Sequence, residues 1–376
     1  MQIIHFWDSS KFFQWCIFFC LFFSMVIFRS SDLSAQTVSL RQPVDTVGFA
    51  TTQKQMDSIM ARIQREQGPM IRRSLKEAKI SGDDAWKTII SPHDDYSYVG
   101  YLYPALFQNL KAKTIILFGV AHKARQLGIE NRIVFDSYPF WKSPGGRIPV
   151  SSIREEIMKE LPSGTYMVSD SLQSIEHSVE ALVPFIQYYR PDVEIISILV
   201  PAMNFERSQE IAHVLALAIQ KAVAKRNWKW GTDFAMVISS DAVHYGDEGW
   251  GGSNYAFYGS DSAGYRNAVK HEWEIILTIS GKFTPAEIRK FTSMTVDEKD
   301  YRTYKWTWCG RYSIPMGLLT SFYLSESLKM KPLQGTSVGY STSIDKKPLQ
   351  VKDLGMGITA PANIHHWVGY PAIVYK

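Results

Sequence analysis

Neither sign of charge is concentrated anywhere along this sequence of 376 residues. Its 41 lysines and arginines and 36 aspartates and glutamates are interspersed and leave a net charge of +5. The sequence contains no basic run of the kind that forms a stripe on nucleic-acid-binding proteins, so we expect no nucleic-acid partner. Internal repeats and low-complexity tracts are also absent, which argues against a repeat architecture. Hydrophobic residues make up 45% of the chain, enough for a large core.

Long apolar runs are missing except near the N-terminus, where Phe12–Phe28 is almost wholly apolar between Lys11 and Arg29. About 17 apolar residues is near the lower limit for a membrane span. The small pair Ser34-Ala35 follows shortly after, as at a signal-peptidase site. We therefore predict that residues 1–35 are a cleaved signal peptide and that the mature protein is exported to the periplasm without membrane contact. An uncleaved N-terminal membrane anchor is the alternative, since the segment before the run is only weakly basic.

Cysteine is scarce, because only Cys16, Cys20 and Cys309 occur. The first two would leave with the signal peptide, so the mature chain would keep Cys309 alone and could form no internal disulfide. A free thiol in an oxidising compartment is a liability unless it is buried or bound to another group. Cys309 is therefore either a buried, inert side chain or a ligand, and this residue alone favours the inert side chain.

Short apolar runs alternate with helical periodicities in the rest of the sequence. The predicted strands are Thr88–Ile90, Thr114–Val120, Ile133–Phe135, Glu194–Val200, Phe234–Ser239 and Trp367–Tyr375. The predicted helices cover 52–66, 177–189, 207–224, 285–291 and 310–324. This alternation predicts an α/β fold with a mostly parallel central sheet and helices on both faces. Residues 36–50 are polar and poorly periodic, so we expect a linker there, followed by a single domain over 51–376.

Histidines and carboxylates stand close to these strands. His93 and His122 each follow a predicted strand, Asp241 and His244 follow a third, and the pair Glu176-His177 opens the helix ahead of a fourth. In open α/β sheets, ligands bind at the carboxyl ends of strands. Each side chain alone has a simpler explanation, as a turn residue, a helix cap or a partner of the helix dipole. Together they are harder to dismiss, because buried polar groups cost free energy unless they are paired.

These residue types suit a metal site. Imidazole nitrogens and a thiolate are ligands for zinc, copper or iron. Three protein ligands with one open position are typical of a catalytic or reactive metal site rather than a closed structural one. A carboxylate beside a histidine can orient the ring and move protons.

Five motifs occur in a specific order along the chain. They are Ser91-Pro92-His93 with Tyr96-Ser97-Tyr98 and Gly100, Phe118-Gly119 with His122, Glu176-His177-Ser178 with Glu180, Ser239-Ser240-Asp241 with His244 and Gly246, and Cys309-Gly310-Arg311. This arrangement resembles the Memo family, whose bacterial members are called AmmeMemoRadiSam system protein B. The resemblance runs from about Ile89 to the C-terminus, and five ordered motifs are far more specific than any one of them.

The resemblance implies a fold, a ligand set and a cofactor. The fold would be similar to the catalytic subunit of class III extradiol dioxygenases, with the site at strand ends. The family's metal ligands are two histidines and a cysteine, which fall by motif on His93, His122 and Cys309. The cofactor would be one transition-metal ion, with iron or copper expected first and zinc as an alternative.

Three functions remain open on this basis. The first is a redox-active iron or copper site of a dioxygenase-like oxidoreductase that acts on an unknown small molecule. In it, the family's pocket pairs would move protons, and these fall by motif on Glu176, His177, Asp241 and His244. The second is a metal-handling or signalling protein without turnover. The third is a zinc-dependent hydrolase in which Glu176 or His244 activates the metal-bound water.

The sequence departs from the family pattern in charge and in location. Asp94 and Asp95 replace the usual alanine and glycine after the first ligand, and Lys123 replaces a histidine after the second. These charges leave the substrate and the metal preference open. The expected export also argues against a cytoplasmic radical-SAM partner, which the bacterial family name implies.

Overall fold

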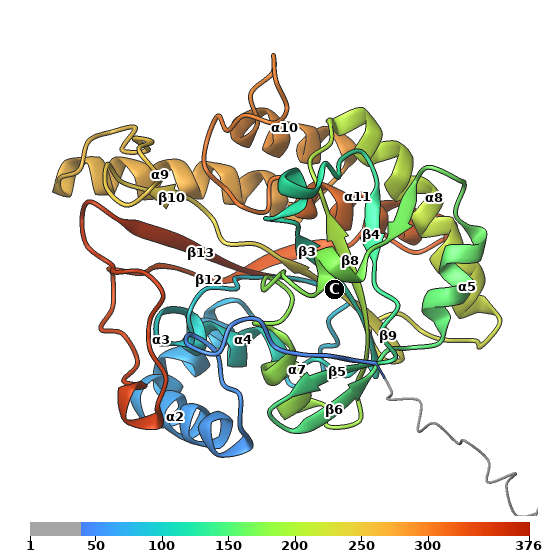
Figure 1. Cartoon of the computed structure of the whole chain (residues 1–376), viewed down its shortest axis with the longest axis horizontal. Helices are drawn as coiled ribbons and strands as arrows, with labels where there is room; N and C mark the ends of the chain where they lie inside the picture. The colour runs from blue at the N-terminus through green and yellow to red at the C-terminus, as the bar shows by residue number, and fades with distance from the viewer. Residues whose placement is uncertain (1–38) are drawn as a thin grey trace, which may run out of the picture. The chain divides into compact units, whose positions relative to one another are not determined.

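A ten-stranded sheet organises the described part of the chain, residues 39–376, in a computed structural model (Figure 1). The predicted signal peptide, residues 1–35, lies outside the described residues. The strand order is β11-β12-β13-β2-β9-β3-β8-β4-β7, with β10 paired to β13. The strands are β2 Thr88–Ser91, β3 Thr114–Val120, β4 Ile133–Phe135, β7 Tyr166–Val168, β8 Glu194–Val200, β9 Phe234–Ser239, β10 His244–Tyr245, β11 Gly281–Lys282, β12 Gln334–Thr342 and β13 Trp367–Tyr375.

The sheet is mixed in direction, which corrects the expectation of a mostly parallel sheet. The central strands β2, β9, β3 and β8 run parallel, and β4 pairs parallel with β7. The pairs β11–β12, β12–β13, β13–β2 and β4–β8 are antiparallel. Parallel neighbours need a long crossover, usually a helix. The segment between β12 and β13 holds only the short turn Lys352–Leu354, so β13 returns antiparallel beside β12.

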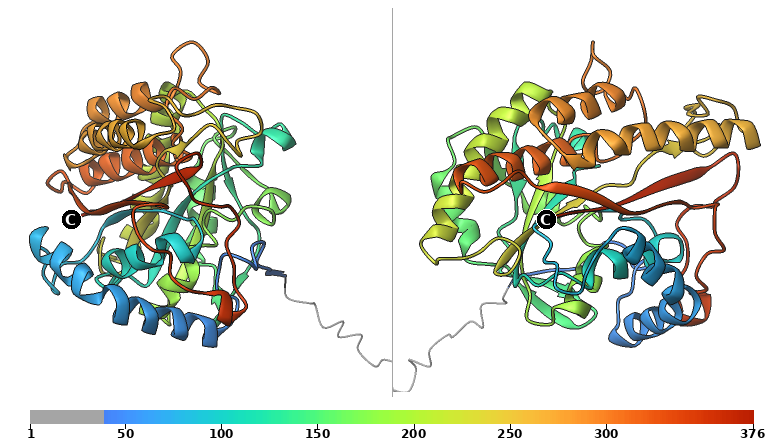
Figure 2. Two further views of the ribbon diagram at one scale, coloured as in Figure 1. Left: turned by 90° about the vertical axis from the view of Figure 1, so that its left-hand side faces the viewer. Right: turned by 180° about the vertical axis from the view of Figure 1, so that it is seen from behind.

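Helices cover both faces of this sheet, and residues that alternate along each central strand contact opposite layers. In β3, Ile116 and Phe118 pack into one layer, whereas Ile115 and Leu117 pack into the other. The first layer contains α5 Ile153–Glu160, α8 Phe205–Ala224, α9 Ser262–Ile279, α10 Pro285–Thr295 and α11 Ser313–Ser327. The second contains α2 Gln53–Glu77, α3 Tyr96–Val99, α4 Tyr103–Phe107 and α7 Val183–Tyr189. Figure 2 shows the two layers from the side and from behind. This arrangement confirms the predicted α/β class.

The segment that begins the described chain is packed against the fold. Within the expected linker, β1 (Leu40–Arg41) pairs with β5 (Phe140–Ser143), which forms a hairpin with β6 (Gly146–Pro149). The guanidinium of Arg41 lies 4.4 Å from the centroid of a tryptophan ring and pairs with the buried carboxylate of Glu180. The charge on Arg41 is thus satisfied although its side chain is only 1% exposed.

Several predicted elements have different bounds in the structure. Strands β3, β4, β8, β9 and β13 have the predicted bounds, because each is a buried run that both neighbouring strands and helices cover. The helix predicted from His177 begins only at Val183. The Glu176 carboxylate accepts hydrogen bonds from the backbone of His177 and Ser178, and this holds the preceding segment in turns. Among the described helices, none combines the length and apolarity that crossing a membrane would need.

Candidate metal centre

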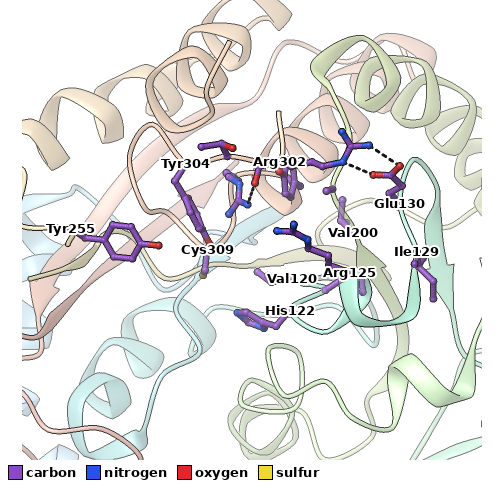
Figure 3. A pocket seen from close by; sticks show the side chains of 17 residues that line it. Val120, His122, Arg125, Ile129, Glu130, Val200, Tyr255, Arg302, Tyr304 and Cys309 are labelled. Atoms are coloured by element: carbon purple, nitrogen blue, oxygen red, sulfur yellow. Dashed lines mark hydrogen bonds and ion pairs between the residues drawn. The ribbon is translucent and has the colours of Figure 1, made fainter. Parts of the chain in front are cut away.

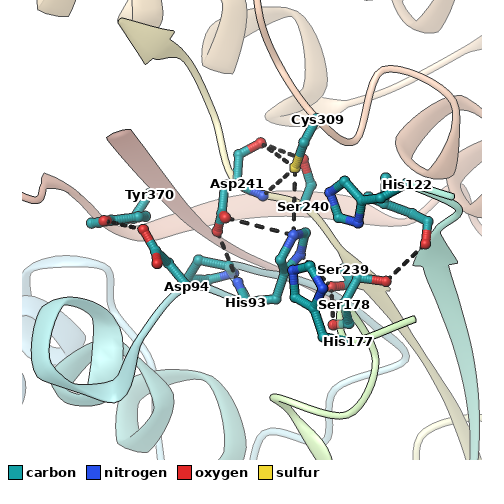
Figure 4. Close-up of polar contacts among 12 residues, drawn as sticks. His93, Asp94, His122, His177, Ser178, Ser239, Ser240, Asp241, Cys309 and Tyr370 are labelled. Carbon is teal, nitrogen blue, oxygen red and sulfur yellow. Dashed lines mark hydrogen bonds and ion pairs between the residues drawn. The ribbon is translucent and has the colours of Figure 1, made fainter. Parts of the chain in front are cut away.

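Three predicted ligands converge at the carboxyl edge of the central strands. His93 follows β2, His122 follows β3, and Cys309 lies in the turn that leads into α11. One possible ligand atom from each lies within 4.8 Å of the others. His122 and Cys309 line a common cavity (Figure 3), and His93 lies behind them with its Nε2 3.7 Å from the Cys309 sulfur (Figure 4). The structure therefore brings together residues that are 216 positions apart in the chain.

The orientation of the His93 ring is fixed by the hydroxyl of Ser239, which contacts both the ring and the backbone carbonyl of Ser178. The hydroxyl of Ser239 donates to the carbonyl of Ser178 at 2.6 Å, so its proton is already used. It can therefore only accept from Nδ1 of His93, which is 2.7 Å away. This assigns the hydrogen of the His93 ring to Nδ1 and leaves Nε2 as a free lone pair directed toward Cys309. Burial and the neighbouring His122 hold the pKa of His93 well below its usual value, so the ring is neutral.

The His122 ring is oriented by the buried carboxylate of Glu176. One carboxylate oxygen lies 2.9 Å from His122 Nδ1, and the other accepts from the His122 backbone N–H at 2.7 Å. Burial alone would raise the pKa of Glu176, but His122, His177 and the backbone N–H of Ser178 lower it to about 2. An ionised carboxylate can only accept, so His122 carries its hydrogen on Nδ1 and also presents Nε2 as the free nitrogen. A carboxylate behind a histidine is a common arrangement for metal ligands.

Cys309 is held against the end of β9 by a close backbone approach. A Cβ atom on the next residue, Gly310, would lie 2.0 Å from the Ser240 hydroxyl oxygen, so only glycine fits. The Cys309 sulfur accepts a hydrogen bond from the backbone N–H of Asp241 at 3.1 Å. Burial, and then the charge of Asp241, raise the pKa of the Cys309 thiol well above its usual value. Without a bound cation the sulfur is a thiol.

Neither the N-terminus of α11 nor Arg311 makes Cys309 a thiolate. The helix begins only at Ser313. The guanidinium of Arg311 lies 3.5 Å from the ring centroid of Tyr304, where it stacks rather than pairing with the sulfur. Burial therefore outweighs both effects. A metal ion would reverse the balance, because a coordinated thiol loses its proton.

Asp241 and His244 lie on the other side of the sulfur and form a second ligand-capable group with Cys309. One oxygen of Asp241 accepts from the His93 backbone at 2.8 Å, and the other lies 3.6 Å from His93 Nε2. Burial, and then Asp94, raise the pKa of Asp241 well above its usual value. His244 Nε2 is buried and has no hydrogen-bond partner among residues 39–376. Such an orphaned nitrogen fits a site that receives a further group, because burying it unpaired is costly.

His177 faces the same site and packs edge-on against the His93 ring, at 5.8 Å between centroids. Its ring stacks on His122 at 4.9 Å between centroids and 6° between planes. Burial, and then the neighbouring His122, lower the pKa of His177 to about 4, so it is neutral near pH 7. The side chain of His177 is 38% exposed, compared with 2% for His93. His177 is therefore placed to meet a small molecule rather than to complete the buried ligand set.

The two carboxylates that depart from the family pattern are already engaged. Asp94 accepts from the Tyr370 hydroxyl at 2.6 Å, and Asp95 accepts from the Thr359 backbone at 2.5 Å. Burial, and then the charge of Asp94, raise the pKa of Asp95 to about 7. Both line a chamber of about 180 Å³ that His93, His177 and His244 also line. The remaining departure, Lys123, is exposed and lies outside this chamber.

Glu272 is a buried residue behind the candidate site that the sequence did not indicate. Its buried carboxylate accepts from the indoles of Trp306 and Trp308, each at 2.6 Å, and from the Val243 backbone at 3.1 Å. Trp308 directly precedes Cys309 in the chain, and Val243 directly precedes His244. Glu272, which lies in α9, thus holds together the two segments that contain Cys309 and His244. Ser239 was visible in the motif but carried no assigned role, since only the structure shows which ring nitrogen it contacts.

Comparisons with known proteins show the family to which this chain belongs. A family model described as Memo-like protein matches residues 54–347. A MEMO1 family protein of Pyrobaculum arsenaticum is 31% identical over 202 residues, which cover 52% of this chain and 65% of that protein. A MEMO1 family protein of Pyrobaculum aerophilum is 29% identical over 191 residues, covering 49% and 60%. One of Methanothermobacter thermautotrophicus is 27% identical over 164 residues, covering 42% and 54%. Each match spans less than two thirds of the relative's own length.

Proposed function

Because this chain belongs to the Memo family, we propose that it holds one redox-active iron or copper ion between His93, His122 and Cys309. The observation that carries the proposal is the shared orientation of the two histidines. Each ring uses its Nδ1 on an orienting group of the protein, so each presents Nε2 to the space beside the Cys309 sulfur. Two imidazoles and a thiolate are a ligand set that iron, copper and zinc all accept. The ion would supply one-electron chemistry and would polarise a bound substrate.

The surrounding residues divide into groups that orient and groups that move protons. Glu176, with a pKa of about 2, stays ionised and orients His122 rather than donating a proton. Asp241, whose pKa is raised, can hold a proton beside His93 Nε2. Burial lowers the pKa of His244 to about 3, so the ring is neutral and its unpaired Nε2 can exchange a proton with a bound group. His177, at the more exposed side, can exchange a proton with a small molecule in the chamber.

The alternative functions use the same residues and differ in the metal and in turnover. A zinc-dependent hydrolase would use His244 as the base. A metal-handling or signalling protein would bind the ion tightly and convert no substrate. A dioxygenase-like reaction, and a fold related to class III extradiol dioxygenases, remain proposals that rest on the resemblance of the motifs.

The test begins with anaerobic purification and elemental analysis. We expect iron or copper in the wild type, and we expect most of it to be lost in Cys309→Ser, because a serine hydroxyl at neutral pH replaces thiolate poorly. His93→Ala and His122→Ala should behave alike. His365→Ala is a matched control. This exposed histidine pairs with Asp247, at 2.9 Å, and is not one of the proposed ligands. Full occupancy with unchanged affinity in Cys309→Ser would show that the ligand set is wrong, and zinc alone would favour the hydrolase.

Export is a separate proposal that rests on the N-terminal sequence. N-terminal sequencing of the native protein should begin close to Gln36. An intact Met1 in a soluble cytosolic fraction would contradict it and would reopen the cytoplasmic radical-SAM partner.

A further inference from the structure

A second cavity, larger than the acidic chamber, opens onto the candidate metal centre. Its volume is about 630 Å³, which lies in the range of small-molecule pockets. His122 and Cys309 both line it, whereas His93 does not. A molecule in this cavity would therefore lie against two of the proposed ligands. The chemistry of the remaining wall indicates what kind of molecule that is.

The wall carries positive charge that the described residues, 39–376, leave uncompensated. Glu130 is the only carboxylate in the lining, and Arg302 binds it through two hydrogen bonds of 3.0 and 2.9 Å. Arg125 also lines the cavity and points into it (Figure 3), yet it forms no ion pair with the described part of the chain. Arg311 has a buried Nε without a hydrogen-bond partner among residues 39–376. Two guanidinium groups thus face the cavity with no anion opposite them.

The rest of the lining is apolar and aromatic. Arg311 is held in place by its stacking, with the guanidinium carbon 3.5 Å from the ring centroid of Tyr304 and 4.6 Å from that of Tyr312. Val120 and Ile129 form part of the opposite wall. A fixed planar guanidinium beside aromatic and aliphatic walls suits a planar anion with an apolar body. The low local dielectric strengthens such a charge pair relative to water.

We propose that this cavity binds a small organic carboxylate with an aromatic or apolar body, and that Arg125 and Arg311 recognise its carboxylate. The apolar body lies along the wall formed by Val120 and Ile129. The further claim that this molecule is the substrate rests on the proposed metal function, because the reaction would need an ion bound by His122 and Cys309 next to the molecule. Binding of the carboxylate itself depends on the arginines and not on the metal.

The experiment measures binding of benzoate and of its neutral isostere benzamide by titration calorimetry, using metal-free, chelator-treated protein. We expect benzoate to bind and benzamide to bind at least tenfold more weakly. Arg311→Met and Arg125→Met should each weaken benzoate binding at least tenfold, and Arg311→Lys should fall between. Arg147→Met is the matched control, because Arg147 also stacks on an aromatic ring, 5.2 Å from the Phe140 centroid, but does not line the cavity. If Arg311→Met fails to fold, the benzoate affinity of Arg125→Met decides the test, because Arg125 is exposed.

Binding and metal content separate this inference from the proposed metal function. His93→Ala should lose metal and keep benzoate affinity, whereas the arginine variants should lose benzoate affinity and keep metal. Equal binding of benzamide and benzoate, absence of benzoate binding, or wild-type affinity in both methionine variants would overturn the inference. Binding of inorganic phosphate without benzoate would overturn the choice of a carboxylate.

Discussion

Replacing Ser239 with alanine should weaken metal binding while leaving the fold intact. The Ser239 hydroxyl is the acceptor for Nδ1–H of His93, at 2.7 Å, because its own proton goes to a backbone carbonyl. In Ser239→Ala this buried N–H loses its partner. The metal-free protein can respond by moving the hydrogen to Nε2, where the Asp241 carboxylate lies 3.6 Å away. The ring then presents the wrong nitrogen to the metal.

The expected loss of metal affinity follows from the free-energy cost of returning the hydrogen from Nε2 to Nδ1 of His93. Binding a metal to Nε2 would return the hydrogen to Nδ1, where it is buried without an acceptor. An unsatisfied buried donor costs about 1–3 kcal/mol, which corresponds to a metal dissociation constant raised about 5- to 150-fold. Loss of a group that orients a metal ligand typically costs about 10- to 100-fold in affinity, in agreement with this range. Thermal stability should fall moderately, because the buried carbonyl of Ser178 loses the hydrogen bond from the Ser239 hydroxyl.

The assay is an anaerobic competition titration against a coloured chelator of known affinity. Ser321→Ala is the control, because Ser321 is also buried and bonds Thr88 Oγ1 at 2.9 Å far from the ligands. It should lower stability without changing the metal dissociation constant. An unchanged metal affinity in folded Ser239→Ala would refute both the assigned ring hydrogen and the role of His93 Nε2.

Three further predictions concern groups around the ligands. Gly310→Ala should lose metal in a folded chain by elemental analysis, since its Cβ would lie 2.0 Å from the Ser240 hydroxyl and displace Cys309. His244→Ala should retain metal content while changing any redox or turnover signal, and a loss equal to that of Cys309→Ser would make His244 a ligand. Glu272→Gln should lower the free energy of unfolding by about 1–3 kcal/mol near pH 5, because an amide cannot accept all the hydrogen bonds that the carboxyl accepts. Burial raises the pKa of Glu272 to about 7 from 4.5, so its contribution is present below about pH 4.5 and is lost as pH rises through about 7. The difference between Glu272→Gln and wild type, measured by chemical denaturation, should therefore narrow from about pH 5 to about pH 8.

The sequence predicted those parts of the fold that depend on local pattern. Strands such as Thr114–Val120 are continuous β-branched and apolar runs, and a run buried on both faces has nearly the same signature wherever it occurs. The strand Gln334–Thr342 was missed because it is polar and contains two glycines. It forms by pairing with β13, a contact between residues that no local window includes.

The candidate site also contains some residues that could be predicted from the sequence and others that could not. The three proposed ligands could be named from motifs that resemble those of the family, and two of them, His93 and His122, follow strand ends. The groups that set their chemistry could not. Glu272 lies in a helix where a glutamate is ordinary, and its partners come from two other segments of the chain. The raised pKa of Cys309 could not be predicted from the sequence, because burial depends on how distant segments pack around it.

The two histidines reach the same ring form through different chemistry, and this has a consequence for the metal. His93 is oriented by the neutral hydroxyl of Ser239, whereas His122 is oriented by the ionised carboxylate of Glu176. A carboxylate on Nδ1–H increases the basicity of the opposite nitrogen more than a hydroxyl does. In the proposed site, His122 would therefore be the stronger electron donor of the pair, and it is also the proposed ligand that both cavities reach. The more basic histidine would stand where substrate and ion meet, and the less basic one would anchor the ion in the buried interior.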